Sequence, residues 1–175
     1  MKIVILEGLP KTGKSTLVSY IKELNIEGVH CVEELILDTK ELDQDSFMKN
    51  DIAKINKYND GLIIIDKGLI STLSYNQMLD ELNGNPSLNQ VQEWFNKEGI
   101  PFYKRNDVYT LYLKTDKIRL REHNNKTPHG TIKNQKRIEQ ITLDNIKKYC
   151  KNYEIINYSY EQKGKIANEI INKYM

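Results

Sequence analysis

The chain has 175 residues, of which 26 are Lys or Arg and 24 are Asp or Glu, so its formal net charge is +2. This length predicts one domain over residues 1–175, large enough for a three-layer α/β core. The near-neutral charge balance argues against the large basic field of nucleic-acid binders and favours a small anionic ligand.

The cysteines and the apolar runs argue against two further classes of protein. Cys31 and Cys150 lie far apart without C-x-x-C spacing, which indicates a reducing compartment and no metal site built on thiols. The longest apolar runs, such as residues 62–65, are too short to cross a bilayer, and the N-terminus lacks the apolar region of a signal peptide. We therefore expect a cytoplasmic protein that acts alone or as a homodimer, without a membrane or nucleic-acid partner.

A phosphate-binding loop is predicted after the first strand. Residues 8–15 fit the pattern G-x-x-x-x-G-K-[ST], between a buried strand predicted over residues 2–7 and a helix predicted over residues 14–24. Backbone N–H groups of such a loop surround phosphates, Lys14 reaches the β- and γ-phosphates, and Ser15 holds Mg²⁺, so ATP and Mg²⁺ are the expected ligands. The candidate nucleotide contacts are Gly8, Lys11, Thr12, Gly13, Lys14, Ser15 and Thr16.

Lys11 adds a second cation inside this loop. A cation there can reach terminal phosphate oxygens and stabilise the charge that spreads over them during phosphoryl transfer. The alternative is a lysine that points to solvent, and the sequence leaves both interpretations open.

The second predicted strand, over residues 29–33, ends beside two glutamates. Successive side chains of a strand point to opposite faces, so one of Glu33 and Glu34 can face the crevice at the end of the sheet while the other faces away. The residues alone do not decide which one faces the crevice. The alternative is that both are solvated acids at a strand end.

The third predicted strand, over residues 61–66, ends in an acid that is followed by a base, Asp66 and Lys67. This pattern resembles a Walker-B strand, where the acid organises Mg²⁺ and an adjacent cation holds a second phosphate group. Ligands of open α/β sheets bind at the carboxyl ends of the strands, which is where these two residues lie. We therefore expect Asp66 to act with Ser15 at the metal.

Strand and helix patterns alternate along the rest of the chain, which is typical of βαβ units and a mostly parallel sheet. Two further strands are expected over residues 108–113 and 153–157. Gly99 and Pro101 are expected to end the fourth helix, and the polar residues 124–131 to form an exposed loop. After the first helix, the expected helices lie within residues 46–57 and over residues 71–82, 88–97, 116–124, 136–151 and 161–173.

The segment after the third strand resembles two kinase families. Residues 66–76 are similar to the D-R-Y-x-x-S-x-x-A-Y-Q segment of thymidylate kinases and to the E-R-S-x-x-S segment of deoxynucleoside kinases. Asp66, Ser71 and Tyr75 match the first pattern. Three positions depart from it: Lys67 stands where that family has arginine, Gly68 where it has tyrosine, and Asn76 where it has glutamine.

This resemblance implies a three-layer P-loop NTPase fold with helices on both faces of a five-stranded parallel sheet in the order 2-3-1-4-5. It also implies a small lid over about residues 119–137, because residues 108–116 are similar to the strand that precedes the lid in these kinases. Arginines of that lid grip phosphoryl oxygens with a planar, permanently charged fork. Arg119 and Arg121 are the candidates, and since they are two residues apart we expect one of them to reach the site.

The resemblance further implies ATP-dependent phosphoryl transfer to a nucleoside or nucleoside monophosphate. In deoxynucleoside kinases a glutamate in the place of Glu33 or Glu34 takes the proton from the substrate hydroxyl, a role that only an alcohol acceptor requires. The residues implied in acceptor binding are Glu33, Glu34, Phe47, Lys67, Tyr75, Asn76 and Tyr103. Those implied in catalysis are Lys11, Lys14, Glu34, Asp66, Lys67, Arg119 and Arg121.

Two alternatives remain open. A kinase of another small alcohol, such as a metabolite or an antibiotic, fits the same motifs if one of the two glutamates acts as a base. An NTPase switch or regulatory nucleotide-binding module belongs to a different class, and residues 66–68 do not read D-x-x-G as a GTPase would require.

Overall fold

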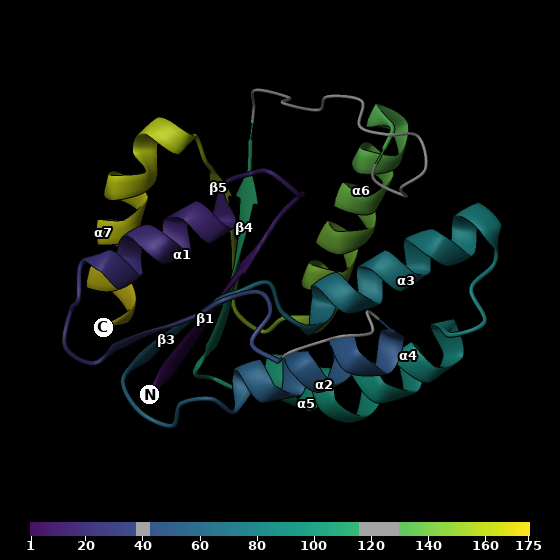
Figure 1. The fold of residues 1–175 in the computed structure, drawn as a ribbon, viewed down its shortest axis with the longest axis horizontal. Coiled ribbons are helices and arrows are strands. Elements are labelled where there is room, and N and C mark those ends of the chain that lie inside the picture. Colours follow the sequence, from purple (N-terminus) through teal and green to yellow (C-terminus); the bar gives the residue numbers. More distant parts are fainter. Residues whose placement is uncertain (38–42, 116–129) are drawn as a thin grey trace.

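Five parallel strands form one sheet in the order β2-β3-β1-β4-β5 (Figure 1). The structure is a computed structural model that describes residues 1–37, 43–115 and 130–175. β1 lies in the middle, with its Leu6 opposite Asp66 on β3 and Leu111 on β4. The predicted sheet and its strand order are confirmed. The strands are β1 (Lys2–Glu7), β2 (Val29–Val32), β3 (Leu62–Asp66), β4 (Val108–Lys114) and β5 (Tyr153–Asn157).

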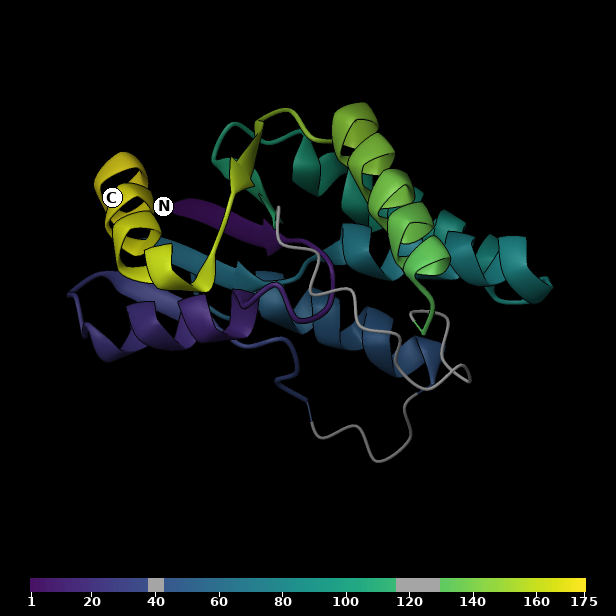
Figure 2. The ribbon, with the colours of Figure 1, turned by 90° about the horizontal axis from the view of Figure 1, so that it is seen from above.

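Helices cover both faces of this sheet, which gives the predicted three layers (Figures 1 and 2). α1 (Lys14–Glu23) and α7 (Lys163–Tyr174) pack on one face, and a 3-10 turn at Tyr160–Gln162 leads into α7. The helices of the other face are α2 (Gln44–Ile55), α3 (Leu69–Asn83), α4 (Leu88–Trp94), α5 (Ile100–Tyr103) and α6 (Ile132–Tyr149).

The two apolar cores follow from the alternation of side chains along each strand. In β1, Ile3 and Ile5 pack toward α2 to α6, whereas Val4 and Leu6 pack toward α1 and α7. All four side chains are fully buried. A parallel sheet covered on both faces requires such continuous apolar strands, which is why the sequence shows them as uninterrupted runs.

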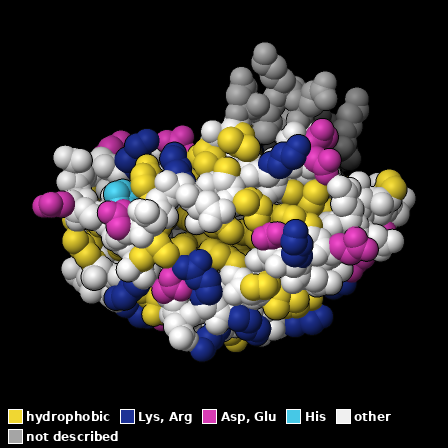
Figure 3. Space-filling view, turned by 90° about the horizontal axis from the view of Figure 1, so that it is seen from below, with side chains coloured by type: hydrophobic (Ala, Val, Ile, Leu, Met, Phe, Trp, Pro, Cys, Tyr) yellow, Lys and Arg dark blue, Asp and Glu magenta, His cyan; other side chains and the backbone are white. Residues whose placement is uncertain are grey.

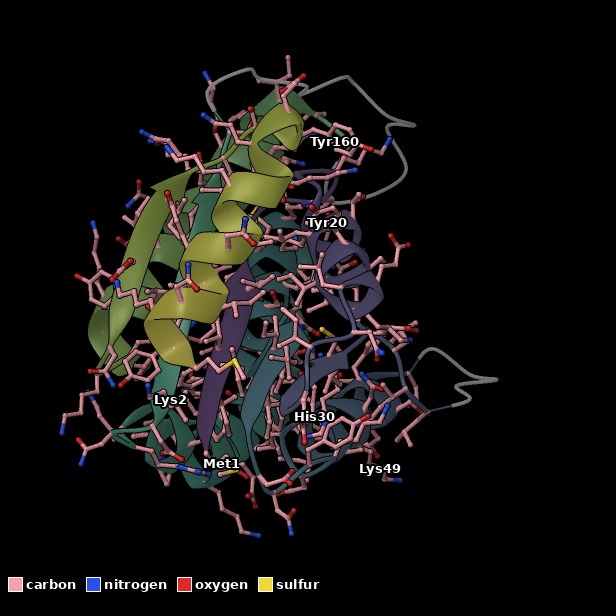
Figure 4. The ribbon with its side chains drawn as sticks, turned by 90° about the vertical axis from the view of Figure 1, so that its left-hand side faces the viewer. Met1, Lys2, Tyr20, His30, Lys49 and Tyr160 are labelled. Carbon is pink, nitrogen blue, oxygen red and sulfur yellow. The ribbon has the colours of Figure 1, made fainter. Side chains whose placement is uncertain are left out.

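The contact between α1 and α7 is closed at one end by a cation between two aromatic rings. Nζ of Lys163 lies 5.4 Å from the ring centre of Tyr20 and 4.6 Å from that of Tyr160. Figure 4 shows the two tyrosines at the same end of these helices. Exposed contacts of this kind stabilise by about 0.5–1 kcal/mol each.

Seen from the side of α2 and α5, apolar side chains gather in the middle of the surface, and basic and acidic side chains are interspersed around them (Figure 3).

Within the described stretches of the chain, no helix is long and apolar enough to cross a membrane.

Two helices begin earlier than expected because side chains cap them. Asp43 accepts a hydrogen bond from the backbone N–H of Ser46 at 2.7 Å and so starts α2 at Gln44. Thr131 accepts one from Asn134 N–H at 3.1 Å and starts α6 four residues before the expected position. The helix expected over residues 116–124, and most of the expected lid, lie outside the described residues.

The expectation that Gly99 and Pro101 end the fourth helix is wrong. A π-helical turn over Phe95–Gly99, in which Ile100 N–H bonds to Phe95 O, carries α4 directly into α5. Pro101, which has no N–H to donate, follows this π turn directly as the second residue of α5. The chain therefore stays helical as far as Tyr103.

We expect Gly99→Ala to lower the free energy of unfolding by about 1–3 kcal/mol, because overpacking of a buried site is destabilising. The new Cβ would lie 2.5 Å from Cδ2 of Phe95, whose ring is fully buried. Urea denaturation followed by circular dichroism measures the change. Gly164→Ala is the matched control, since its Cβ would meet the mobile end of Tyr20 at 3.2 Å and alanine favours a helix. Equal losses in both variants would contradict the prediction.

Candidate active site

The phosphate loop surrounds the ammonium group of Lys14. Lys14 Nζ donates hydrogen bonds to the carbonyl oxygens of Gly8 at 2.8 Å and Leu9 at 2.7 Å, and to Thr12 Oγ1 at 3.2 Å. Lys14 is 4% exposed, and burial together with the nearby charge of Lys67 lowers its pKa to about 8. The loop thus holds a cation at its centre, where phosphate oxygens would be bound.

Glycine is required at two positions of this loop. A Cβ on Gly8 would lie 2.7 Å from the carbonyl oxygen of Leu113, and φ at this residue is +146°. At Gly13, with φ of +94°, a Cβ would lie 3.2 Å from the ring of Tyr158. Lys11 adopts a left-handed φ of +66° and is exposed. The two glycines of the motif therefore stand where a side chain would be strained and crowded.

Ser15 and Asp66 offer oxygen atoms from the elements that flank the end of β1. Ser15 lies in the first turn of α1 and is exposed, and Asp66 ends β3 beside the central strand. Asp66 is 1% exposed, and its Oδ1 has no hydrogen-bond partner among the described residues. A buried carboxylate oxygen without a partner fits Mg²⁺, which prefers oxygen ligands and bound water. These residues are therefore suited to hold the metal that the loop implies.

A cavity of about 600 Å³ opens between α2 and α3 and reaches the phosphate loop. Gly8, Leu9 and Pro10 form its wall on the loop side. Its volume lies within the range of small-molecule sites. Of the residues implied in acceptor binding, those that line it are Glu34, Phe47, Lys67, Tyr75 and Asn76.

Glu34, not Glu33, belongs to this cavity. The ammonium of Lys67 donates a hydrogen bond to Glu34 Oε1, and both side chains line the cavity wall. Glu33 points the other way and forms an exposed ion pair with Lys22 of α1 at 2.9 Å. Of the two glutamates that the sequence left open, Glu34 is the one that lines the cavity.

Phe47 and Tyr75 face the cavity from opposite helices, α2 and α3. Both are half-buried, and burial raises the pKa of the Tyr75 hydroxyl. Flat side chains on two walls are suited to a planar ring. Tyr103 is different: it is 1% exposed and does not line the cavity, and its hydroxyl accepts a hydrogen bond from Ile70 N–H at 3.2 Å.

Gly68 lies between Tyr103 and the end of β1. A Cβ at this position would lie 2.5 Å from Oη of Tyr103 and 2.8 Å from Cγ2 of Ile5. No side chain fits there. The tyrosine that the thymidylate kinase pattern has at this position is therefore excluded from the present fold.

Glu7 is a buried acid that the sequence did not single out. Its carboxylate accepts hydrogen bonds from Gly68 N–H at 3.0 Å and from the hydroxyl of Ser71. Glu7 is fully buried, and burial raises its pKa to about 7, although these hydrogen bonds and Lys14 act in the opposite direction. It links the last residue of β1 to the start of α3.

α2 contributes polar groups that sequence reasoning also missed. Asp51 and Lys54 form an ion pair of 2.8 Å, and Thr72 donates to Asp51 Oδ2 at 2.7 Å. Asn76 donates to Gln44 Oε1 at 2.7 Å, whereas the buried Nε2 of Gln44 has no partner among the described residues. The available signal was helical spacing, because the α2 residues that line the cavity are Gln44, Phe47, Asn50, Asp51 and Lys54.

The lid candidates are placed only in part. Arg119 and Arg121 lie outside the described residues. Arg137, a further basic residue of the expected lid, pairs with Glu81 of α3, with its Nε 2.7 Å from Glu81 Oε2. This contact joins the start of α6 to α3.

The fold is shared with solved structures of low sequence identity. A thymidylate kinase from Candida albicans superposes with a TM-score of 0.65 at 15% identity, over 98% of this chain and 90% of that one. A deoxyadenosine kinase from M. mycoides with bound dATP gives 0.65 at 13% identity, over 97% and 99%. The YorR protein of Bacillus subtilis, in complex with phosphorylated GDP, gives 0.58 at 16% identity, over 98% and 95%. No protein-family model and no curated protein matches the sequence. The chain thus has a thymidylate and deoxynucleoside kinase-like fold.

We expect Glu7→Gln to stabilise the protein at neutral pH and to have little effect near pH 4.5. The Glu7 carboxyl titrates near 4.5 in the unfolded chain and near 7 in the folded protein. Between these values the folded protein holds a proton that the unfolded chain has lost, so the free energy of unfolding falls as pH rises. Glutamine does not titrate, and the advantage of the variant should reach on the order of 3 kcal/mol at pH 8.

Urea denaturation of both proteins at several pH values from 4.5 to 8 measures this difference. Glutamine keeps an oxygen for Gly68 N–H, so the local hydrogen bonding is largely retained. A difference that does not change with pH would contradict the buried, proton-holding role of Glu7.

Proposed function

We propose that this protein transfers the γ-phosphoryl group of ATP to a nucleoside or nucleoside monophosphate, with the uncharged nucleoside as the preferred acceptor. One observation carries the proposal: Gly8, Leu9 and Pro10 of the phosphate loop are also a wall of the acceptor cavity. A molecule in the cavity would therefore lie against the phosphates that the loop binds. Such proximity is the main contribution of kinases to catalysis.

The charges around the cavity favour an uncharged acceptor. Among the described residues that line it, Lys67 is paired with Glu34 and Lys54 with Asp51. The two cations are matched by two anions, so neither is left over for the dianionic phosphate of a monophosphate. The similarity to the deoxyadenosine kinase of M. mycoides supports the same preference.

Glu34 is suited to act as the general base. As the hydroxyl oxygen of the acceptor attacks the γ-phosphorus, Glu34 accepts the hydroxyl proton. The bond from the γ-phosphorus to the bridging oxygen breaks, and ADP leaves with that electron pair. Lys14 would bind oxygens of the β- and γ-phosphates, and Ser15 and Asp66 would hold Mg²⁺. Bound Mg²⁺ would neutralise charge on the phosphates.

The amide end of the cavity is suited to a nucleobase. Gln44 and Asn76 are hydrogen-bonded to each other, and Gln44 keeps a buried N–H donor without a partner among the described residues. An acceptor atom on a base edge would satisfy it. Phe47 and Tyr75 would lie on the two sides of the ring.

A nucleoside monophosphate is the second candidate acceptor. The similarity to the thymidylate kinase of Candida albicans, over 98% of this chain, supports it. Arg119 and Arg121, outside the described residues, are the candidates for the additional positive charge that it would require. In either case we propose that residues 1–175 act as one cytoplasmic kinase domain.

An acceptor panel tests the proposal. With Mg²⁺-ATP, we expect nucleosides to give ADP and a phosphorylated product, detected by a coupled assay and by mass spectrometry. Lys14→Ala should abolish both signals while the protein stays folded. Product from monophosphates but not from nucleosides would contradict the preferred acceptor. Product from other small alcohols alone would contradict both the nucleoside and the monophosphate as acceptors. ADP release that needs no acceptor would contradict kinase function.

We expect Glu34→Gln to lower kcat for a hydroxyl acceptor by roughly 100-fold or more, because the general base is lost. The KM for ATP should change little, since Glu34 lies on the acceptor side. Glu33→Gln is the matched control: this neighbour pairs with Lys22 outside the cavity, and its kcat should stay near that of the unmodified protein. A larger loss in Glu33→Gln than in Glu34→Gln would reverse the assignment.

A further inference from the structure

Lys67 has an unusual backbone conformation for a lysine. Its φ is +57°, in the left-handed region that costs free energy for a residue with a side chain. Such conformations persist only where the surrounding structure holds them, and they are frequent at functional sites. The ammonium of this residue reaches Glu34 in the cavity, so its conformation has a direct bearing on the site.

Hydrogen bonds fix the turn on both sides of Lys67. Lys67 N–H donates to Leu6 O at 3.0 Å, and the next N–H, that of Gly68, donates to Glu7 at 3.0 Å. The carbonyl groups are held from α2: Lys54 Nζ donates to Lys67 O at 2.9 Å, with a longer contact of 3.4 Å to Asp66 O. One lysine side chain thus contacts both peptide carbonyls of the turn.

Burial of the Lys54 ammonium costs free energy that apolar packing cannot offset. Lys54 is 2% exposed, and a buried ammonium is unfavourable unless it is paired and hydrogen-bonded. Asp51 supplies the charge at 2.8 Å and is itself held by Thr72 of α3 at 2.7 Å. This chain of contacts runs from α3 through α2 to the turn after β3.

We infer that Lys54 is a positioning residue, which holds the left-handed turn at Lys67 and thereby places the Lys67 ammonium against Glu34. Its part in catalysis rests on the proposed function, since Lys67 and Glu34 matter there only if an acceptor binds between them and the phosphate loop. Its part in holding the turn does not. The two parts are therefore tested separately.

The first test measures the turn without any substrate. In Lys54→Met/Asp51→Asn, methionine keeps the length of the side chain and asparagine removes the charge that Lys54 would otherwise leave unpaired. We expect hydrogen exchange of the Lys67 and Gly68 amides to become faster by on the order of tenfold or more, because their opening costs less. Lys173→Met/Glu154→Gln removes a remote ion pair between α7 and β5, and exchange in the turn should not change there.

Unchanged exchange at Lys67 and Gly68 would overturn the inference. Asp51→Asn alone is the milder variant, since it keeps Lys54 and removes only the charge of its partner. It should speed exchange less than the double variant does. This second variant keeps the test decisive if the double variant does not fold.

The second test uses activity in two backgrounds. Lys54→Met/Asp51→Asn should lower kcat by about 10- to 100-fold, with the KM for ATP nearly unchanged. In a Lys67→Met background, the same two substitutions should lower kcat by no more than about twofold, because Lys54 then has no Lys67 ammonium left to position. Equal losses in both backgrounds would indicate a general structural role and overturn the inference. An inactive unmodified protein would contradict the proposed function and leave the exchange result intact.

Discussion

The carboxylate of Glu7 joins the two halves of the candidate site. It directly precedes the phosphate loop and accepts hydrogen bonds from Gly68 and Ser71 at the start of α3. Because the group is fully buried, these bonds form where water cannot compete. The position of the phosphate loop relative to the cavity is therefore set by β1 and α3, which these hydrogen bonds join. Transfer between two bound molecules depends on just such a fixed separation.

Two lysines stay buried around this link because each has several partners. Lys54 has Asp51 and two carbonyl groups, and Lys14 has the carbonyls of its own loop. Removing one member leaves another buried without compensation, which costs far more than an exposed ion pair contributes. α2 thus belongs to the site as firmly as the phosphate loop does, although it carries no recognisable motif.

The sheet and the phosphate loop could be predicted because their signals are local. Buried parallel strands appear as apolar runs, and the loop needs glycine at fixed spacing. The continuous helix through Gly99 could not be predicted, since the π turn that accommodates Pro101 depends on packing around Phe95. The choice of Glu34 and the burial of Lys54 depend on contacts between elements far apart in sequence. Motif patterns carry no information on those contacts.

The left-handed residue after β3 also has a consequence for sequence change. Leu62 and Ile64 of β3 face α1 and α7, and by the same alternation Asp66 turns toward that face, while Lys67 lines the cavity between α2 and α3. Two adjacent residues thus lie on opposite faces at the end of this strand. Insertion or deletion of one residue within β3 would exchange their sides and invert the strand's apolar pattern as well. This strand can therefore vary by substitution but not in length.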